Sequence, residues 1–246
     1  MNKNVFGLIG YPLTHSFSKK YFDEKFFKEK INDAHFELFS IPNIEAFNEL
    51  ITIENLKGLA VTIPYKKLVI PYLNEVDDVV KKLGACNCIT LKNDFLKGYN
   101  TDVLGFEKSL LQHLKPNNNK ALILGTGGAA AAVEFVLEKL NIDYLVVSRE
   151  AKNNNCITYQ SLNKETIQSH TLIINTTPLG TFPDVNDCPN IPYQFLSENH
   201  LLFDLVYNPS ITKFMQKGLE KGASVANGFD MLVYQAEENW KIWNTH

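Results

Sequence analysis

The sequence predicts an α/β fold made of two α/β domains. Apolar runs of strand length alternate with stretches whose apolar residues recur at helical spacing, which is typical of mainly parallel sheets. The Asn-rich segment 115–119 is the clearest linker and separates a first α/β series from a second. The second series opens with a strand, a glycine turn at 125–128, a helix and another strand. Together these three observations define the expected architecture.

The first series is expected to hold three strands, a hairpin and the helices between them. Aromatic residues at helical intervals predict the first helix, and Pro42 is placed to begin the second. The expected elements are a strand at 5–10, a helix at 17–30, a strand at 35–41, a helix at 42–51, a strand at 56–63, a helical stretch reaching 83, hairpin strands at 86–91 and 95–99, and a helix at 103–114.

The second series is expected to be a run of strands with helices between them. Its expected elements are strands at 121–124, 144–147, near 157, 171–175, 201–205 and 223–226, with helices at 129–140, 212–221 and 231–243. Gly222 stops the second of these helices, and 176–180 is expected to be a turn.

The glycine turn has the spacing G-x-G-x-x-A, formed by Gly125, Gly127 and Ala130. In a βαβ unit the first glycine permits a tight turn, and the second lets the backbone approach a pyrophosphate. The small third residue lets helix and strand pack closely, and the helix N-terminus offers unpaired amides with a partial positive charge. We therefore expect a Rossmann-like dinucleotide-binding domain, with S-adenosylmethionine binding as the main alternative.

Composition excludes several other classes of protein. A net charge of −3 over 246 residues provides no basic surface for nucleic acid and no polybasic membrane patch. No apolar stretch reaches the roughly 20 residues of a membrane span, and the chain begins directly on a strand, without a signal peptide. The four cysteines form no C-x-x-C pair and the histidines are scattered. We expect a cytoplasmic protein with reduced thiols and no metal.

Polar side chains follow the ends of two strands in the first series. Ser16 and Ser18 come after the first strand, and Thr62 and Lys66 come at the end of the third. Sites in parallel sheets lie beyond the carboxyl ends of strands, so this convergence favours a site. Each residue also has a simpler interpretation: the serines can cap the following helix, and Lys66 can be a solvated lysine. Asp102 is likewise a candidate N-cap of the helix at 103–114.

Eight segments together resemble the shikimate dehydrogenase family, and the resemblance covers nearly the whole chain. They are 10–18 (GYPLTHSFS), 61–66 (VTIPYK), 84–87 (GACN), 98–102 (GYNTD), 125–129 (GTGGA), 175–180 (NTTPLG), 204–209 (DLVYNP) and 231–236 (MLVYQA). Each segment alone is a weak motif, but eight in the family's order and spacing are a specific signal.

The resemblance implies an enzyme that reversibly reduces the ring ketone of 3-dehydroshikimate to shikimate with NADPH, in aromatic amino-acid biosynthesis. It implies a substrate domain formed by 1–101 and 230–246 and an NADP-binding domain formed by 102–229. The expected partner is the small-molecule substrate, and the expected state is a monomer or a homodimer. The alternatives are an NAD-using quinate/shikimate dehydrogenase and a catalytically silent nucleotide-binding sensor module.

The same resemblance assigns the site residues. Lys66 and Asp102 would form the catalytic pair, and ketone reduction does need a proton donor beside the developing alkoxide. The residues that would bind substrate are Ser16 and Ser18 at the carboxylate, Thr62, Asn87, Asp102 and Gln235 at the ring hydroxyls, and Tyr207 at the domain cleft. The residues that would bind NADP are Gly125, Gly127, Gly128 and Ala129 at the pyrophosphate, Ser148 and Arg149 at the ribose and its phosphate, and Leu205 and Gly228 at the nicotinamide.

The chain departs from the family's pattern at a few positions. Cys88, Thr181 and Asp230 stand where threonine, methionine and glycine are usual, and Ser148-Arg149-Glu150 replaces Asn-Arg-Thr. Arg149 is the only arginine in the chain, and a guanidinium suits the 2′-phosphate of NADP. Glu150 would favour NAD if it faced the ribose instead. We expect Arg149 to dominate, because it lies closer to the end of the strand.

Overall fold

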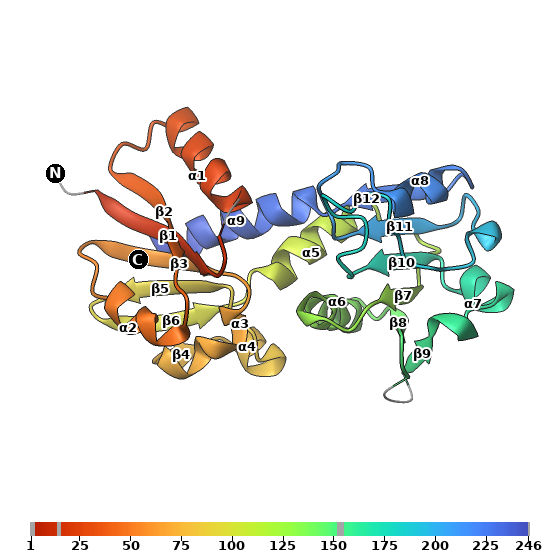
Figure 1. Cartoon of the computed structure of the whole chain (residues 1–246), viewed down its shortest axis with the longest axis horizontal. Helices are drawn as coiled ribbons and strands as arrows, with labels where there is room; N and C mark the ends of the chain where they lie inside the picture. Colours follow the sequence, from red (N-terminus) through yellow and green to blue (C-terminus); the bar gives the residue numbers. More distant parts are fainter. Residues whose placement is uncertain (1–2, 14–15, 152–154, 246) are drawn as a thin grey trace. The chain divides into compact units, whose positions relative to one another are not determined.

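The computed structural model describes residues 3–13, 16–151 and 155–245, and the chain divides into two compact units (Figure 1). Unit 1 consists of Met1–Leu104 and Gln235–His246, and unit 2 consists of Gly105–Tyr234. The chain passes from one unit to the other within α5 (Asp102–Leu111) and returns within α9 (Phe229–Asn244). Each unit has its own six-stranded sheet, so the expected α/β architecture is confirmed.

The sheet of unit 1 has the strand order β2-β1-β3-β5-β6-β4. Its strands are β1 (Asn4–Gly10), β2 (Ala34–Ser40), β3 (Leu56–Val61), β4 (Glu75–Val76), β5 (Cys88–Lys92) and β6 (Phe95–Tyr99). β1 pairs in parallel with β2 and β3, whereas β5 is antiparallel to both β3 and β6. The helices are α1 (Phe17–Lys28), α2 (Phe47–Leu50), α3 (Tyr65–Leu68) and α4 (Asp78–Leu83), with 3₁₀ turns η1 (Ile44–Ala46) and η2 (Ile70–Tyr72).

The C-terminal half of α9 completes the core of unit 1. The Trp243 ring stacks on Phe6 with centroids 5.2 Å apart, and its indole N–H donates to the Ile89 carbonyl at 3.0 Å. A Cβ atom at Gly58 would lie 2.3 Å from the Trp243 ring, so only glycine leaves room for this packing. The last residues of the chain are thereby held against the sheet that its first residues begin.

Unit 2 has an entirely parallel sheet with the order β12-β11-β10-β7-β8-β9. Its strands are β7 (Lys120–Leu124), β8 (Asp143–Ser148), β9 (Cys156–Thr158), β10 (Leu172–Asn175), β11 (Leu201–Asp204) and β12 (Ser224–Asn227). Its helices are α6 (Gly128–Lys139), α7 (Lys164–Ser169) and α8 (Lys213–Leu219), with 3₁₀ turns η3 (Tyr159–Ser161) and η4 (Tyr193–Phe195). This is the Rossmann order, and its direction reverses between β7 and β10, where ligands bind in open α/β sheets.

Several elements differ from the sequence expectations. The helix expected at 42–51 is split into η1 and α2, each about one turn long, and the short elements β4 and α7 were not expected. Elements this short carry too few residues for a periodic pattern. The structure also does not support the interpretation of Asp102 as the N-cap of this helix. Asp102 lies in the first turn of α5, and the side-chain oxygen of Asn100 accepts the Val103 amide at 3.3 Å.

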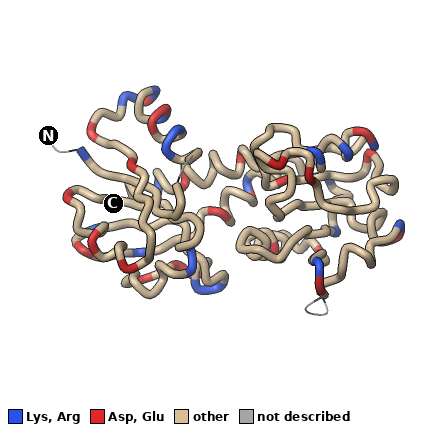
Figure 2. Tube along the Cα trace, viewed as in Figure 1, with Lys and Arg blue, Asp and Glu red and all other residues tan. Residues whose placement is uncertain are grey.

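Acidic and basic residues are interspersed over both units (Figure 2), consistent with the small net charge of −3. Within the described parts of the chain, no helix has both the length and the apolar character needed to cross a bilayer.

Candidate active site

The loops that follow β1 and β3 are joined at the carboxyl ends of these neighbouring strands. The Tyr11 amide donates to the Ile63 carbonyl at 3.1 Å, and the Thr62 amide donates to the Ile9 carbonyl at 2.9 Å. A Cβ atom at Gly10 would lie 2.5 Å from the Thr62 side chain, so glycine allows this close approach. Thr62 is therefore held at the edge of the sheet where the site was expected.

Lys66 and Asp102 form an ion pair at the same edge. The Lys66 Nζ lies 2.6 Å from Asp102 Oδ2, and the side chains are 34% and 18% exposed. Lys66 lies in α3, directly after the β3 loop, and its carbonyl accepts the Cys86 amide at 2.7 Å. Asp102 lies in the first turn of α5. Because the pair is only partly buried, its polar atoms are accessible to a small molecule.

Asn87 and Gln235 belong to one chain of buried hydrogen bonds. The Asn87 amide donates to Thr101 Oγ1 at 3.0 Å, Thr101 contacts Asn239 Oδ1 at 2.7 Å, and Asn239 donates to Gln235 Oε1 at 3.3 Å. Sequence reasoning selected Asn87 and Gln235 but missed Thr101 and Asn239. Two signals were available: Asn239 follows Gln235 by one helical turn, and Thr101 directly precedes Asp102.

Ser16 and Ser18 lie at the start of α1, after β1. Ser16 is the N-cap of α1, and its hydroxyl accepts the Lys19 amide at 3.3 Å, so the capping interpretation holds for Ser16. Ser18 is half-buried in the first turn of the same helix. No hydrogen bond between the described residues joins either serine to the Lys66–Asp102 pair.

The glycine turn of unit 2 lies where the strand order reverses. Gly125 has φ +112°, a backbone conformation that favours glycine. A Cβ atom at this position would lie 2.9 Å from the side chains of Thr176 and Thr177, which follow β10. Gly127 is the N-cap of α6, and a Cβ at Gly127 or Gly128 would meet no atom within 4 Å. The turn therefore leaves open space in front of the α6 amides, next to the exposed Ala129. These features fit a pyrophosphate group.

The end of β8 separates the two residues predicted at the adenosine ribose. Ser148 is buried, and its hydroxyl donates to the Glu150 carbonyl and accepts the Glu150 amide at 3.3 Å. Ser148 therefore stabilises the backbone conformation of residues 148–150. Arg149, by contrast, is exposed. Burial raises the pKa of the nearby Tyr159, and the Arg149 cation opposes that rise. The Arg149 guanidinium fits a phosphate ligand.

Leu205 and Gly228 meet at the carboxyl ends of β11 and β12. A Cβ atom at Gly228 would lie 2.1 Å from the Leu205 carbonyl oxygen, so no larger residue fits without moving the backbone. Tyr207 follows in the same loop and is 40% exposed. Tyr207 belongs to unit 2, whereas the other predicted substrate-binding residues belong to unit 1.

A buried carboxylate, Asp204, joins the loops after β10 and β11. Its Oδ1 accepts from the Asn175 side chain at 2.9 Å and from the Val206 amide at 3.0 Å, and its Oδ2 accepts from Thr212 at 2.5 Å. Burial raises the pKa of Asp204 to about 6, against the opposing effect of these three donors. Asn175 in turn accepts the amide and hydroxyl of Thr177, beside Gly125.

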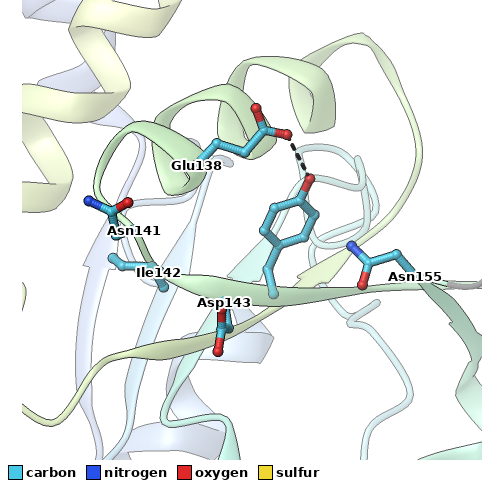
Figure 3. Close-up of a pocket in the computed structure, with 6 residues that line it drawn as sticks. Glu138, Asn141, Ile142, Asp143 and Asn155 are labelled. Carbon is cyan, nitrogen blue, oxygen red and sulfur yellow. Dashed lines mark hydrogen bonds between the residues drawn. The ribbon is translucent and has the colours of Figure 1, made fainter.

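Unit 2 has a cavity of about 570 Å³ next to Glu138 of α6 and Asp143 of β8 (Figure 3). It is lined by Glu138, Asn141, Ile142, Asp143, Tyr144 and Asn155. The Tyr144 hydroxyl donates to Glu138 at 3.2 Å. These residues come largely from the end of α6 and the start of β8, whereas the glycine turn follows the end of β7. The cavity therefore does not contain the predicted pyrophosphate site.

Comparison with known proteins identifies the family. The family described as "Shikimate dehydrogenase substrate binding domain" matches residues 8–89. A shikimate dehydrogenase (NADP(+)) of Clostridium beijerinckii is 37% identical over 247 residues, covering 97% of this chain and 91% of the relative. The Thermus thermophilus shikimate 5-dehydrogenase, solved with NADP(H) and shikimate, has a TM-score of 0.85 at 26% identity, covering 98% of this chain and 93% of that one.

Structural similarity extends further than sequence similarity. A quinate dehydrogenase from Corynebacterium glutamicum, solved with NAD, has a TM-score of 0.88 at only 20% identity, covering 99% of this chain and 94% of that one. Because so low an identity shows the fold alone, the sequence relatives and the order of the eight motifs decide the family. With a 37% identical relative that covers 97% of its residues, the chain belongs to the shikimate dehydrogenase family.

Proposed function

We propose that this chain catalyses the reversible, NADP-dependent reduction of 3-dehydroshikimate to shikimate, in the shikimate pathway of aromatic amino-acid biosynthesis. The observation that carries the proposal is the accessible ion pair between Lys66 and Asp102, 2.6 Å apart at the carboxyl ends of β1 and β3. It lies beside a set of neutral hydrogen-bonding side chains, which suits a polyhydroxylated acid. Unit 1 is assigned to the substrate and unit 2 to NADP.

Lys66 is assigned the proton transfer. Reduction of a ketone develops negative charge on the carbonyl oxygen, and an ammonium group can both stabilise that charge and donate the proton. Asp102 holds the Lys66 ammonium in place through the 2.6 Å contact and offers its other oxygen to a ring hydroxyl. In the direction of shikimate oxidation, the same pair accepts the hydroxyl proton.

The remaining polar residues of unit 1 are assigned to substrate binding. Thr62, Asn87 and Gln235 would hydrogen-bond ring hydroxyls, and the hydroxyls of Ser16 and Ser18 would bind the carboxylate. A lost hydrogen bond to a charged carboxylate is worth roughly 1.5–3 kcal/mol. The Ser16→Ala, Ser18→Ala double variant should therefore raise the KM for shikimate and leave the KM for NADP unchanged.

The described residues of unit 2 fit NADP. Gly125, Gly127, Gly128 and Ala129 leave the α6 N-terminus open to the pyrophosphate, and the exposed Arg149 fits the 2′-phosphate. When bound, NADPH supplies the hydride. Ser148 supports the ribose loop, Leu205 and Gly228 border the nicotinamide, and Tyr207 adds a hydroxyl to the substrate. We place the enzyme in the cytoplasm, as its four cysteines are free thiols.

The proposal is tested by supplying the purified chain with shikimate and NADP and following the absorbance of the reduced nicotinamide. Parallel reactions replace NADP with NAD and shikimate with quinate. Faster turnover with NAD or with quinate would favour the quinate/shikimate dehydrogenase. NADP binding measured by calorimetry, without turnover of either substrate, would indicate a silent nucleotide-binding module.

A further inference from the structure

Four polar side chains of unit 1 are almost completely removed from solvent. Asn87, Thr101, Asn239 and Gln235 are 3%, 2%, 1% and 8% exposed. Buried polar groups are almost always hydrogen-bonded, because an unpaired one loses its hydrogen bonds to water without replacement. In this group the pairing joins the two segments of the chain that flank the β5–β6 hairpin, at Asn87 and Thr101, to α9, which is distant in sequence.

The single hydroxyl proton of Thr101 gives this hydrogen-bond chain a direction. Two amide oxygens, which only accept, lie within reach of Thr101 Oγ1: Asn239 Oδ1 at 2.7 Å and Asn87 Oδ1 at 3.2 Å, so the shorter contact is the one to Asn239. Thr101 therefore donates to Asn239 and accepts from the Asn87 amide nitrogen at 3.0 Å. The Thr101 backbone amide donates to Asn87 Oδ1 at 2.7 Å, which fixes the orientation of the Asn87 side chain.

The same direction continues into α9. Because Oδ1 of Asn239 faces Thr101, its amide nitrogen faces Gln235 Oε1, at 3.3 Å. The orientation of the Gln235 amide is thereby set, with its oxygen toward Asn239. In the proposed function this amide binds a ring hydroxyl, and whether it offers that hydroxyl a donor or an acceptor depends on its orientation.

We propose that Asn239 is a positioning residue of the substrate site, which, with Thr101, sets the amide orientations of Asn87 and Gln235. This inference rests on the proposed function, since it assigns those two amides to the ring hydroxyls. A misoriented amide presents an acceptor where a donor is needed, so specificity for the hydroxyl pattern depends on a residue that need not touch the substrate.

Thr101 provides a matched pair of variants. T101V keeps the side-chain shape but removes the hydroxyl that joins Asn87 to Asn239, whereas T101S keeps the hydroxyl. T101V should raise the KM for shikimate about tenfold, the upper end for one neutral hydrogen bond, with the KM for NADP unchanged. In T101S the KM for shikimate should stay within about twofold of the wild-type value.

N239D tests the direction of the chain. An aspartate at this position still accepts from Thr101 but places an acceptor against Gln235 Oε1, so Gln235 must rotate its amide. The KM for shikimate should then rise at least as much as in T101V, again without a change for NADP.

N118A is the control for loss of a buried polar group. Asn118 is 2% exposed, lies in unit 2 and donates to the Thr171 carbonyl at 3.2 Å. N118A should lower the midpoint of thermal unfolding and leave the KM for shikimate unchanged.

Three results would overturn the inference. The first is an unchanged KM for shikimate in both T101V and N239D, and the second is a KM for shikimate that rises as much in T101S as in T101V. The third is a higher KM for shikimate in N118A, which would show that loss of thermal stability alone raises this KM. Absence of shikimate turnover by the wild-type chain would instead contradict the proposed function itself.

Discussion

Replacing Asp204 with asparagine should change how the stability of the protein depends on pH. Asp204 is fully buried, and burial raises the pKa of its carboxyl from 3.8 to about 6. A carboxyl whose pKa is higher in the folded protein than in the unfolded chain stabilises the fold while it is protonated. That stability is complete below the unfolded pKa and is lost as the pH rises through the folded pKa.

The size of the effect follows from the pKa difference. A rise from 3.8 to about 6 corresponds to about 3 kcal/mol over the whole titration, at about 1.4 kcal/mol per pKa unit. About 2 kcal/mol of this falls between pH 4.5 and pH 7.5. The asparagine of the D204N variant cannot ionise, but its oxygen can still accept from Asn175 and from the Val206 amide. Its amide nitrogen faces the Thr212 hydroxyl, which adds a cost that does not depend on pH.

The assay is urea unfolding of the wild-type chain and D204N at pH 4.5 and pH 7.5. All other groups titrate equally in the two proteins, so the wild-type free energy of unfolding minus that of D204N isolates Asp204. This difference should become more negative by about 2 kcal/mol between the lower and the higher pH. In the control D78N the change should be small and of opposite sign, since Lys81 lowers the pKa of the exposed Asp78. A wild-type–D204N difference that is equal at both pH values would refute the argument.

Three further predictions concern activity and cofactor binding. Lys66→Ala should lower kcat by roughly 10²–10⁴-fold, because the proton donor is lost, and steady-state kinetics showing only a higher KM would contradict this role. Arg149→Ala should raise the KM for NADP about ten- to a hundredfold and leave the KM for NAD nearly unchanged, since only NADP carries the 2′-phosphate; equal effects on the two cofactors would refute the assignment. Gly228→Ala would place a Cβ atom 2.1 Å from the Leu205 carbonyl oxygen and so displace the backbone beside the nicotinamide. Calorimetry should therefore show weaker NADP binding, and unchanged NADP binding would mean that this contact does not shape the site.

Much of the fold could be predicted from sequence because its signals are local. The buried strand β7, the glycine turn and α6 lie within 20 consecutive residues, 120–139, so one short window contains strand, turn and helix. Lys66 could be selected for the same reason: it directly follows a strand end within a recognisable segment. The elements that escaped prediction, β4 and α7, are too short to show a period.

The sequence by itself determined the alternation of strands and helices, the glycine turn, the family and the candidate residues at strand ends. The tertiary structure alone decided the reversal of strand order between β7 and β10, the burial that raises the pKa of Asp204, and the contact of Thr101 with Asn239. The physical reason is distance along the chain. Thr101 and Asn239 are 138 residues apart, and each shows only a common polar side chain until α9 packs onto the sheet of unit 1.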